Sequence, residues 1–137
     1  MTIEAEIQDI KEMLDDIPDD FAKYSIIIEM GDELEPYPEE FKLDEQKVPG
    51  CQSDLWLMVE RKDDIIHYRA VSDAVIVKGL VALMLQILND RTQVEIQNFD
   101  IDLLKELGIK GLLTPGRQNG VSSLIQRIQL LAAWTRN

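Results

Sequence analysis

Apolar residues near the start of the chain recur every three or four positions. They are Ile3, Ile7, Ile10 and Leu14. This spacing places them on one face of an amphipathic helix, with Thr2 as its predicted N-cap. A second helix is predicted to begin at Pro18, because proline is favoured at the first helical position, and to end near Glu35. Two prolines follow closely, so we expect the polar segment 36–47 to be a loop.

At residue 53 the helical period gives way to strict alternation. One face of the predicted strand carries Ser53, Leu55, Leu57 and Val59. The residues between them point to the opposite face. The charged residues 61–64 predict a turn and residues 65–71 predict a returning strand, so the sequence predicts a β-hairpin.

The most apolar part of the chain follows this hairpin. Ser72 and Asp73 are candidate N-caps for a helix that runs to about Asn89. This helix is apolar nearly all round, so we expect it at the centre of the core.

The last third of the chain predicts three more helices. Two are short, one beginning at Thr92 and one over residues 102–107 that ends at Gly108. A longer helix to the C-terminus is predicted from the apolar stripe Val121, Leu124, Ile125, Ile128 and Leu131. The segment 114–120 before it is rich in turn-forming residues.

These periods predict an α+β fold, in which a small antiparallel β-sheet packs against several helices. The chain has 137 residues, of which 45% are hydrophobic, so it can bury a sizeable core. We therefore predict one domain that spans residues 1–137.

The charge is concentrated in the first part of the chain. The formal net charge is −12; residues 1–50 carry 16 acidic and 4 basic side chains, and residues 51–137 carry 10 of each. This excess argues against sequence-independent binding of nucleic acid. It is compatible with attraction of a basic protein partner, or with a solvated acidic face that confers solubility only.

No targeting or membrane segment is predicted. The longest apolar run, residues 74–88, is interrupted by Lys78 and Gln86, and it is shorter than the roughly 20 residues that a membrane-spanning helix needs. The acidic N-terminus lacks the features of a signal peptide. We predict a soluble, cytoplasmic protein that contacts no membrane.

Cys51 is the only cysteine, so it forms no internal disulfide, and the sequence contains no zinc-ligand pattern. A lone cysteine is ordinarily a small buried hydrophobic residue. However, Cys51 follows the Pro49-Gly50 turn and precedes the polar residues Gln52 and Ser53, a setting in which functional side chains are often displayed. From these residues alone, both interpretations remain open.

Three other residues carry groups that could take part in chemistry. His67 lies in the returning strand, at a position expected to alternate outward, so it is a poor candidate for a base that activates Cys51. Lys78 could reach solvent from its apolar helix or serve a site. Arg117 could pair with a carboxylate or stabilise a sulfur anion, although turn formation alone accounts for its neighbours Asn119 and Gly120.

Three blocks of sequence together resemble the SufE/CsdE family of sulfur-acceptor proteins. They are V-P-G-C-Q-S-D-L-W-L at 48–57, S-D-A-V-I-V-K-G-L at 72–80 and L-T-P-G-R-Q-N-G at 113–120. Their order and spacing match those of the family, and the resemblance covers nearly the whole chain.

The resemblance implies a specific function. Members of this family bind a pyridoxal-phosphate cysteine desulfurase, take its sulfane sulfur onto a cysteine that maps to Cys51, and deliver it to an iron–sulfur cluster scaffold. The chain would then be a sulfur carrier that activates the desulfurase rather than a stand-alone enzyme. It would need neither a cofactor nor a metal of its own, and its fold would be similar to that of IscU-type scaffolds.

The resemblance also assigns roles to other residues. Pro49, Gly50, Gln52 and Ser53 would form and support the loop that carries the thiol. Five other residues would bind the partner or stabilise the persulfide: Asp73, Lys78, Arg117, Asn119 and Gly120. In one departure from the family pattern, Val71 occupies a position where many members have an acidic residue, so no second carboxylate is assigned there.

The strand alternation, extended back to Cys51, predicts that its side chain is turned toward the apolar interior at rest. Gly50 would be the hinge that swings it outward. Three alternatives remain: a thiol peroxidase or redox sensor, an acidic adaptor in which Cys51 is structural, and a cluster scaffold. One cysteine and one histidine are too few for the usual cluster ligands, which disfavours the scaffold.

Overall fold

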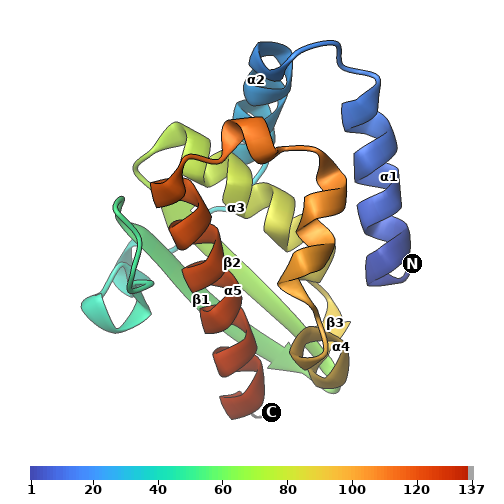
Figure 1. Ribbon diagram of the computed structural model, residues 1–137. Helices are drawn as coiled ribbons and strands as arrows, with labels where there is room; N and C mark the ends of the chain where they lie inside the picture. Colours follow the sequence, from blue (N-terminus) through green and yellow to red (C-terminus); the bar gives the residue numbers. More distant parts are fainter. Residues whose placement is uncertain (136–137) are drawn as a thin grey trace.

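Figure 1 shows a computed structural model of the chain, which describes residues 1–135. The α-helices are α1 (Ile3–Asp15), α2 (Asp20–Gly31), α3 (Val75–Leu88), α4 (Gln93–Gln97) and α5 (Pro115–Trp134). The strands are β1 (Leu55–Lys62), β2 (Ile65–Ser72) and β3 (Arg91–Thr92). Short 3-10 helices are η1 (Glu39–Phe41), η2 (Asp44–Gln46), η3 (Ile101–Leu107) and η4 (Lys110–Leu112). The predicted α+β class is confirmed.

The sheet has the strand order β1-β2-β3 and is antiparallel throughout. The β1–β2 hairpin pairs Leu55 with Ser72 at one end and Lys62 with Ile65 at the other. Strand β1 begins two residues later than predicted, because Ser53 belongs to the loop before it. Strand β3 was not predicted, since two residues cannot show a period of alternation.

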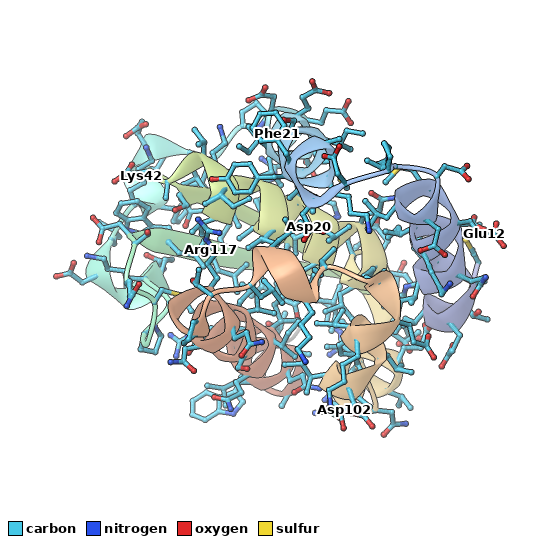
Figure 2. The ribbon with its side chains drawn as sticks, turned by 45° about the horizontal axis from the view of Figure 1, so that its top comes forward. Glu12, Asp20, Phe21, Lys42, Asp102 and Arg117 are labelled. Atoms are coloured by element: carbon cyan, nitrogen blue, oxygen red, sulfur yellow. The ribbon has the colours of Figure 1, made fainter. Side chains whose placement is uncertain are left out.

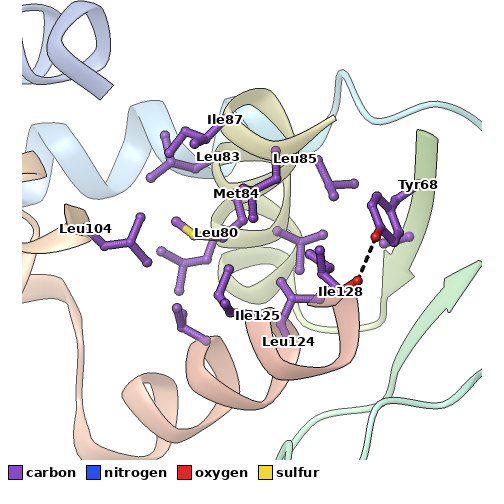
Figure 3. Close-up of a cluster of buried hydrophobic side chains, with 14 of the residues drawn as sticks. Tyr68, Leu80, Leu83, Met84, Leu85, Ile87, Leu104, Leu124, Ile125 and Ile128 are labelled. Carbon is purple, nitrogen blue, oxygen red and sulfur yellow. Dashed lines mark hydrogen bonds between the residues drawn. The ribbon is translucent and has the colours of Figure 1, made fainter. Parts of the chain in front are cut away.

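The core surrounds α3 and takes buried side chains from α1, α2, η3, α5 and one face of the hairpin. Helix α3 contacts α1, α2, β2 and α5, as expected for a helix that is apolar nearly all round. Figure 3 shows side chains of α3 and α5 gathered in one cluster, with Tyr68 of β2 at its edge. The Tyr68 hydroxyl is buried and donates a hydrogen bond of 2.6 Å to the carbonyl oxygen of Ile128, which satisfies this polar group inside the core.

Helix α2 is shorter at both ends than predicted. It begins at Asp20 because the side chain of Asp19 accepts a hydrogen bond from the Ala22 amide, which leaves Pro18 outside the helix. It ends at Gly31 because the next three residues form hydrogen bonds to carbonyls three positions back, the spacing of a tightening 3-10 turn.

Helix α5 begins at Pro115, so residues 115–120 are helical and the prediction of a separate turn there was wrong. Thr114 is the N-cap, its side chain accepts a hydrogen bond from the Arg117 amide, and proline occupies the first helical position. The glycines that suggested a turn instead let α5 lie close to the loop around Cys51: a Cβ atom at Gly116 would be 2.5 Å from the side-chain oxygen of Gln52.

The remaining short elements agree with the sequence in part. The short helix predicted from Thr92 is α4, and Thr92 is its N-cap, with a reciprocal bond to Glu95. The helix expected over residues 102–107 is the 3-10 helix η3, which ends at Gly108 with φ +69°. Among residues 1–135, no helix combines the length and apolar character needed to cross a bilayer.

Candidate functional site

Cys51 lies in a short loop, residues 49–54, that enters β1; we call it the Cys51 loop. Its base is closed by a 2.8 Å hydrogen bond from the Val48 amide to the Leu55 carbonyl. Gly50 has φ +84°, a conformation that glycine adopts without strain. A Cβ atom at Gly50 would also lie 2.5 Å from the Ser123 hydroxyl of α5, so the backbone angle favours glycine and any other residue would displace the Ser123 side chain.

The Cys51 side chain is half-buried and faces α5. Its sulfur is 3.7 Å from the carbonyl oxygen of Gly120, within reach of a weak S–H···O hydrogen bond. It lines a cavity of about 290 Å³ between the loop, α3 and α5. The apolar lining consists of Leu55, Ala74, Ile76, Val77, Leu80, Val81, Val121 and Leu124, and the polar lining includes Gln52, Ser53, Thr114 and Arg117.

Burial raises the pKa of the Cys51 thiol above that of an ordinary cysteine. The thiolate is the reactive form, and an apolar surround disfavours it. In this conformation the thiol is therefore protonated at neutral pH and slow to react.

Arg117 lies at the rim of the cavity, but its guanidinium group is directed toward α2 (Figure 2). It donates a 3.0 Å hydrogen bond to the Leu112 carbonyl, and it stacks over the Tyr24 ring at 5.5 Å from the ring centre. Its hydrogen bond is thus to a main-chain oxygen rather than to a carboxylate.

The other predicted site residues differ in their distance from the thiol. A Cβ atom at Gly120 would be 3.7 Å from the Cys51 sulfur, so this glycine is immediately beside it. Asp73 and Asn119 are exposed and do not line the cavity. Lys78 is half-buried on the side of α3 that meets α2, where its Cβ lies close to Gly31.

One contact of the loop was not foreseen as part of the site. Ser72, at the end of β2, is buried and donates a 2.6 Å hydrogen bond to the carbonyl oxygen of Asp54, the last residue of the Cys51 loop. Ser72 does not cap α3 as predicted, since the N-cap position is Ala74 and no side chain caps the helix. The alternation of β2 contained the signal, because Ser72 follows Tyr68 and Ala70 on the buried face.

His67 lies away from the thiol. It pairs across the hairpin with Glu60, and its ring contacts Glu35 through Nε2 and Asp90 through Nδ1, the latter at 2.8 Å. Burial lowers the pKa of His67, but the hydrogen bonds to the two carboxylates outweigh this effect and raise it. His67 therefore belongs to a surface cluster, in agreement with its predicted outward position. Across residues 1–135, no three His, Cys, Asp or Glu side chains gather as metal ligands.

The site and fold define a small α+β protein with one sheltered thiol, and comparisons identify its family. The SufE family profile, described as an Fe-S metabolism associated domain, matches residues 8–132. An uncharacterized SufE-like protein of Rhizobium meliloti (strain 1021) is 37% identical over 128 residues, which cover 85% of this chain and 91% of that relative. The cysteine desulfuration protein SufE of Wigglesworthia glossinidia brevipalpis is 36% identical over 109 residues, covering 78% and 76%.

The fold also matches a solved structure. The solution structure of a hypothetical protein from Thermus thermophilus aligns with a TM-score of 0.78 over 94% of each chain, at 16% sequence identity. The chain belongs to the SufE family, and its role lies in iron–sulfur metabolism.

Proposed function

We propose that this protein accepts sulfane sulfur on Cys51 from a pyridoxal-phosphate cysteine desulfurase, stimulates that enzyme, and passes the sulfur to an iron–sulfur cluster scaffold. Family membership and the name of the Wigglesworthia relative, a cysteine desulfuration protein, support the reaction class. The observation that carries the proposal is the half-buried Cys51 thiol beside a largely apolar cavity.

The transfer is a thiol exchange with no net oxidation. The Cys51 thiol loses its proton to solvent, and its thiolate attacks the outer sulfur of a desulfurase persulfide. The S–S bond of the donor breaks, the desulfurase thiolate leaves and takes up a proton, and Cys51 becomes a persulfide. Because Cys51 is the only cysteine, no internal thiol can convert this persulfide into a disulfide and release the sulfur.

The cavity supplies shelter for the product. A persulfide is readily reduced by cytosolic thiols, so its outer sulfur needs protection during transit. The space of about 290 Å³ next to the Cys51 sulfur accommodates one additional sulfur atom, and the surrounding side chains of α3 and α5 restrict access of reductants.

In the proposed transfer the loop moves, because the half-buried thiol has to reach the donor persulfide and because burial raises its pKa. We assign this motion to the Pro49-Gly50 turn, with Gln52 and Ser53 supporting the loop in its closed position. Gly50, with its positive φ, is the natural hinge.

The remaining residues of the family blocks are assigned roles in contacting the desulfurase or in accommodating the sulfur. Asp73 and Asn119 are exposed and available for contact with the desulfurase, whereas Gly120 leaves space for the sulfur. Arg117, which lines the cavity, would supply positive charge to the persulfide or to the partner once the loop opens, whereas Lys78, which does not line it, would supply charge to the partner. We place this reaction in the cytoplasm, where glutathione keeps a lone thiol reduced.

The thiol environment argues against the redox alternative. A peroxidase or redox-sensor cysteine needs a depressed pKa and an accessible thiolate. Burial shifts the pKa of Cys51 in the opposite direction. An adaptor in which Cys51 is merely structural would tolerate its replacement without loss of desulfurase stimulation.

Alanine production by a cysteine desulfurase distinguishes these functions. The wild-type protein is expected to raise the rate of alanine formation from cysteine, because it removes the enzyme-bound sulfur, and Cys51→Ser is expected to abolish this increase. Equal stimulation by both proteins would favour the adaptor.

A further inference from the structure

The Ser72 hydroxyl joins the Cys51 loop to the start of α3. Ser72 is 4% exposed. Its Oγ donates to the Asp54 carbonyl at 2.6 Å and accepts from the Ala74 amide at 3.3 Å. One buried hydroxyl thus uses both its donor and an acceptor position to hold together two segments that border the cavity.

A second, exposed attachment holds the same residue of the loop. Lys47 Nζ is 2.9 Å from the Asp54 carboxylate, and it lies 5.8 Å from the centre of the Trp56 ring. The two charged side chains are 42% and 50% exposed, so water and salt screen their attraction. The buried hydroxyl bond is therefore the stronger of the two restraints on Asp54.

These restraints leave little freedom to the loop in its closed position. The Val48–Leu55 hydrogen bond fixes the two ends of the loop against each other. Any outward movement of Cys51 must then be taken up within residues 49–54. Gly50 allows rotation on one side of the thiol, and on the other side the Asp54 carbonyl is held by Ser72.

We propose that Ser72 is a positioning residue that holds the Cys51 loop closed over the cavity, and that its bond to Asp54 breaks when the thiol is exposed. This inference rests on the proposed function for its purpose, which is to keep Cys51 sheltered between sulfur acceptance and delivery. Ser72 does not touch the reacting sulfur; it acts on Cys51 through the main chain of the loop.

The test is the rate at which a small maleimide alkylates Cys51 in Ser72→Ala. This substitution removes one oxygen and adds no atom, so the fold is retained, which far-UV circular dichroism verifies. Loss of the hydrogen bond to Asp54, together with the longer one from the Ala74 amide, is expected to raise the alkylation rate about threefold to tenfold. Ser122→Ala is the matched control, because Ser122 is a half-buried serine on α5 outside the cavity around Cys51.

A second variant separates the two attachments of Asp54. Asp54→Asn keeps the carbonyl but removes the charge that pairs with Lys47, and we expect it to change the rate less than about twofold. The pH profile of alkylation adds a readout that loss of stability alone would not move. In Ser72→Ala the apparent pKa of Cys51 is expected to fall toward that of an ordinary cysteine, because the thiol spends more time in water.

The inference is overturned by a Ser72→Ala rate equal to that of Ser122→Ala, by an unchanged pH profile, or by a larger effect of Asp54→Asn. None of these measurements uses a desulfurase. Failure of the proposed sulfur transfer would therefore be seen separately, as absence of a persulfide on Cys51.

Discussion

The protonated resting state of the Cys51 thiol results from its partly apolar surroundings and not from contact with a catalytic base. Apolar side chains from α3 and α5 border its cavity, and burial raises the pKa of the thiol. His67, the single histidine of the chain, is occupied with Glu35 and Asp90. In the proposed transfer, the thiolate would form where the desulfurase, or water admitted by loop opening, stabilises it.

Gly50 provides a test of the hinge at the scale of one residue. In Gly50→Ala the new Cβ would meet Ser123, and the positive φ would cost about 1–2 kcal/mol. We expect lower stability, measured by urea unfolding, together with faster alkylation of Cys51, because the closed loop is the conformation that becomes strained.

Gly108→Ala is the control for this substitution. Gly108 has φ +69°, and no atom lies within 4 Å of the position that a Cβ would take, so the substitution adds backbone strain without a steric contact. It is expected to lose stability while leaving the alkylation rate of Cys51 unchanged. If both variants altered alkylation equally, the effect would come from global destabilisation and the hinge role of Gly50 would be contradicted.

His67 predicts a pH dependence of stability. Its carboxylate partners raise its pKa in the folded state above the ordinary value of 6.5. The stabilisation that protonated His67 gains from these carboxylates is fully present below the ordinary pKa, and it is lost as the pH rises through the raised pKa. The free energy of unfolding of the wild type should exceed that of His67→Gln most at about pH 5.5, and this difference should shrink toward about pH 8.5.

Glu35→Gln removes one carboxylate from this cluster and serves as the comparison. It should show a smaller change of stability with pH than the wild type, since the raised pKa of His67 depends partly on Glu35. A constant difference between wild type and His67→Gln across this pH range would contradict the assignment.

At the scale of elements, the close approach of α2 to α3 depends on Gly79. A Cβ atom there would be 2.2 Å from the main-chain oxygen of Ile27, which cannot move without displacing α2. Gly79→Ala is therefore expected to lower the free energy of unfolding by about 1–3 kcal/mol. Gly111→Ala places its Cβ equally close to the Asp20 carboxylate, a side chain that can rotate away. The decrease in the free energy of unfolding, measured in urea, should therefore be clearly smaller for Gly111→Ala than for Gly79→Ala.

The elements show which features the sequence could predict. Periodicity identified α1, the hairpin and α3, because each buries one face or lies fully inside the core. It missed β3 and the first turns of α5. The two-residue strand β3 is defined only by its pairing with β2. The glycines at the start of α5 allow close packing against the Cys51 loop, but in the sequence they look the same as glycines that form a turn.

The site was predictable only in part. Cys51, Gly50 and Gly120 stand out through the family blocks, and the structure brings these three together. Strand alternation also indicated the inward orientation of the thiol. Two contacts could not be predicted: the hydrogen bond from Ser72 to Asp54 and the stacking of Arg117 on Tyr24. Each joins residues from different parts of the chain, whose relative positions depend on the whole fold.

At the scale of the molecule, the acidic charge resides in α1, α2 and the segment leading to the Cys51 loop, while residues 51–137 are neutral overall. Buried side chains from the first helix to the last belong to one continuous hydrophobic cluster. That the chain folds as one domain stays a prediction.

Urea unfolding tests this prediction. Far-UV circular dichroism follows all helices, whereas the fluorescence of Trp56 follows the entry of the Cys51 loop into β1, and Trp134→Phe removes the second, exposed tryptophan. We expect coincident transitions, as for a single cooperative domain. A fluorescence transition at clearly lower urea would show that the hairpin and its loop unfold separately.

The central claim is that Cys51 carries sulfur as a persulfide, and intact mass spectrometry tests it most directly. The protein is incubated with a cysteine desulfurase and cysteine and separated without reductant, and its intact mass is measured. We predict an increase of about 32 Da, the mass of one sulfur atom, that is reversed by dithiothreitol and absent in Cys51→Ser. An unmodified wild-type protein beside an active desulfurase, or an equal adduct on Cys51→Ser, would contradict the account.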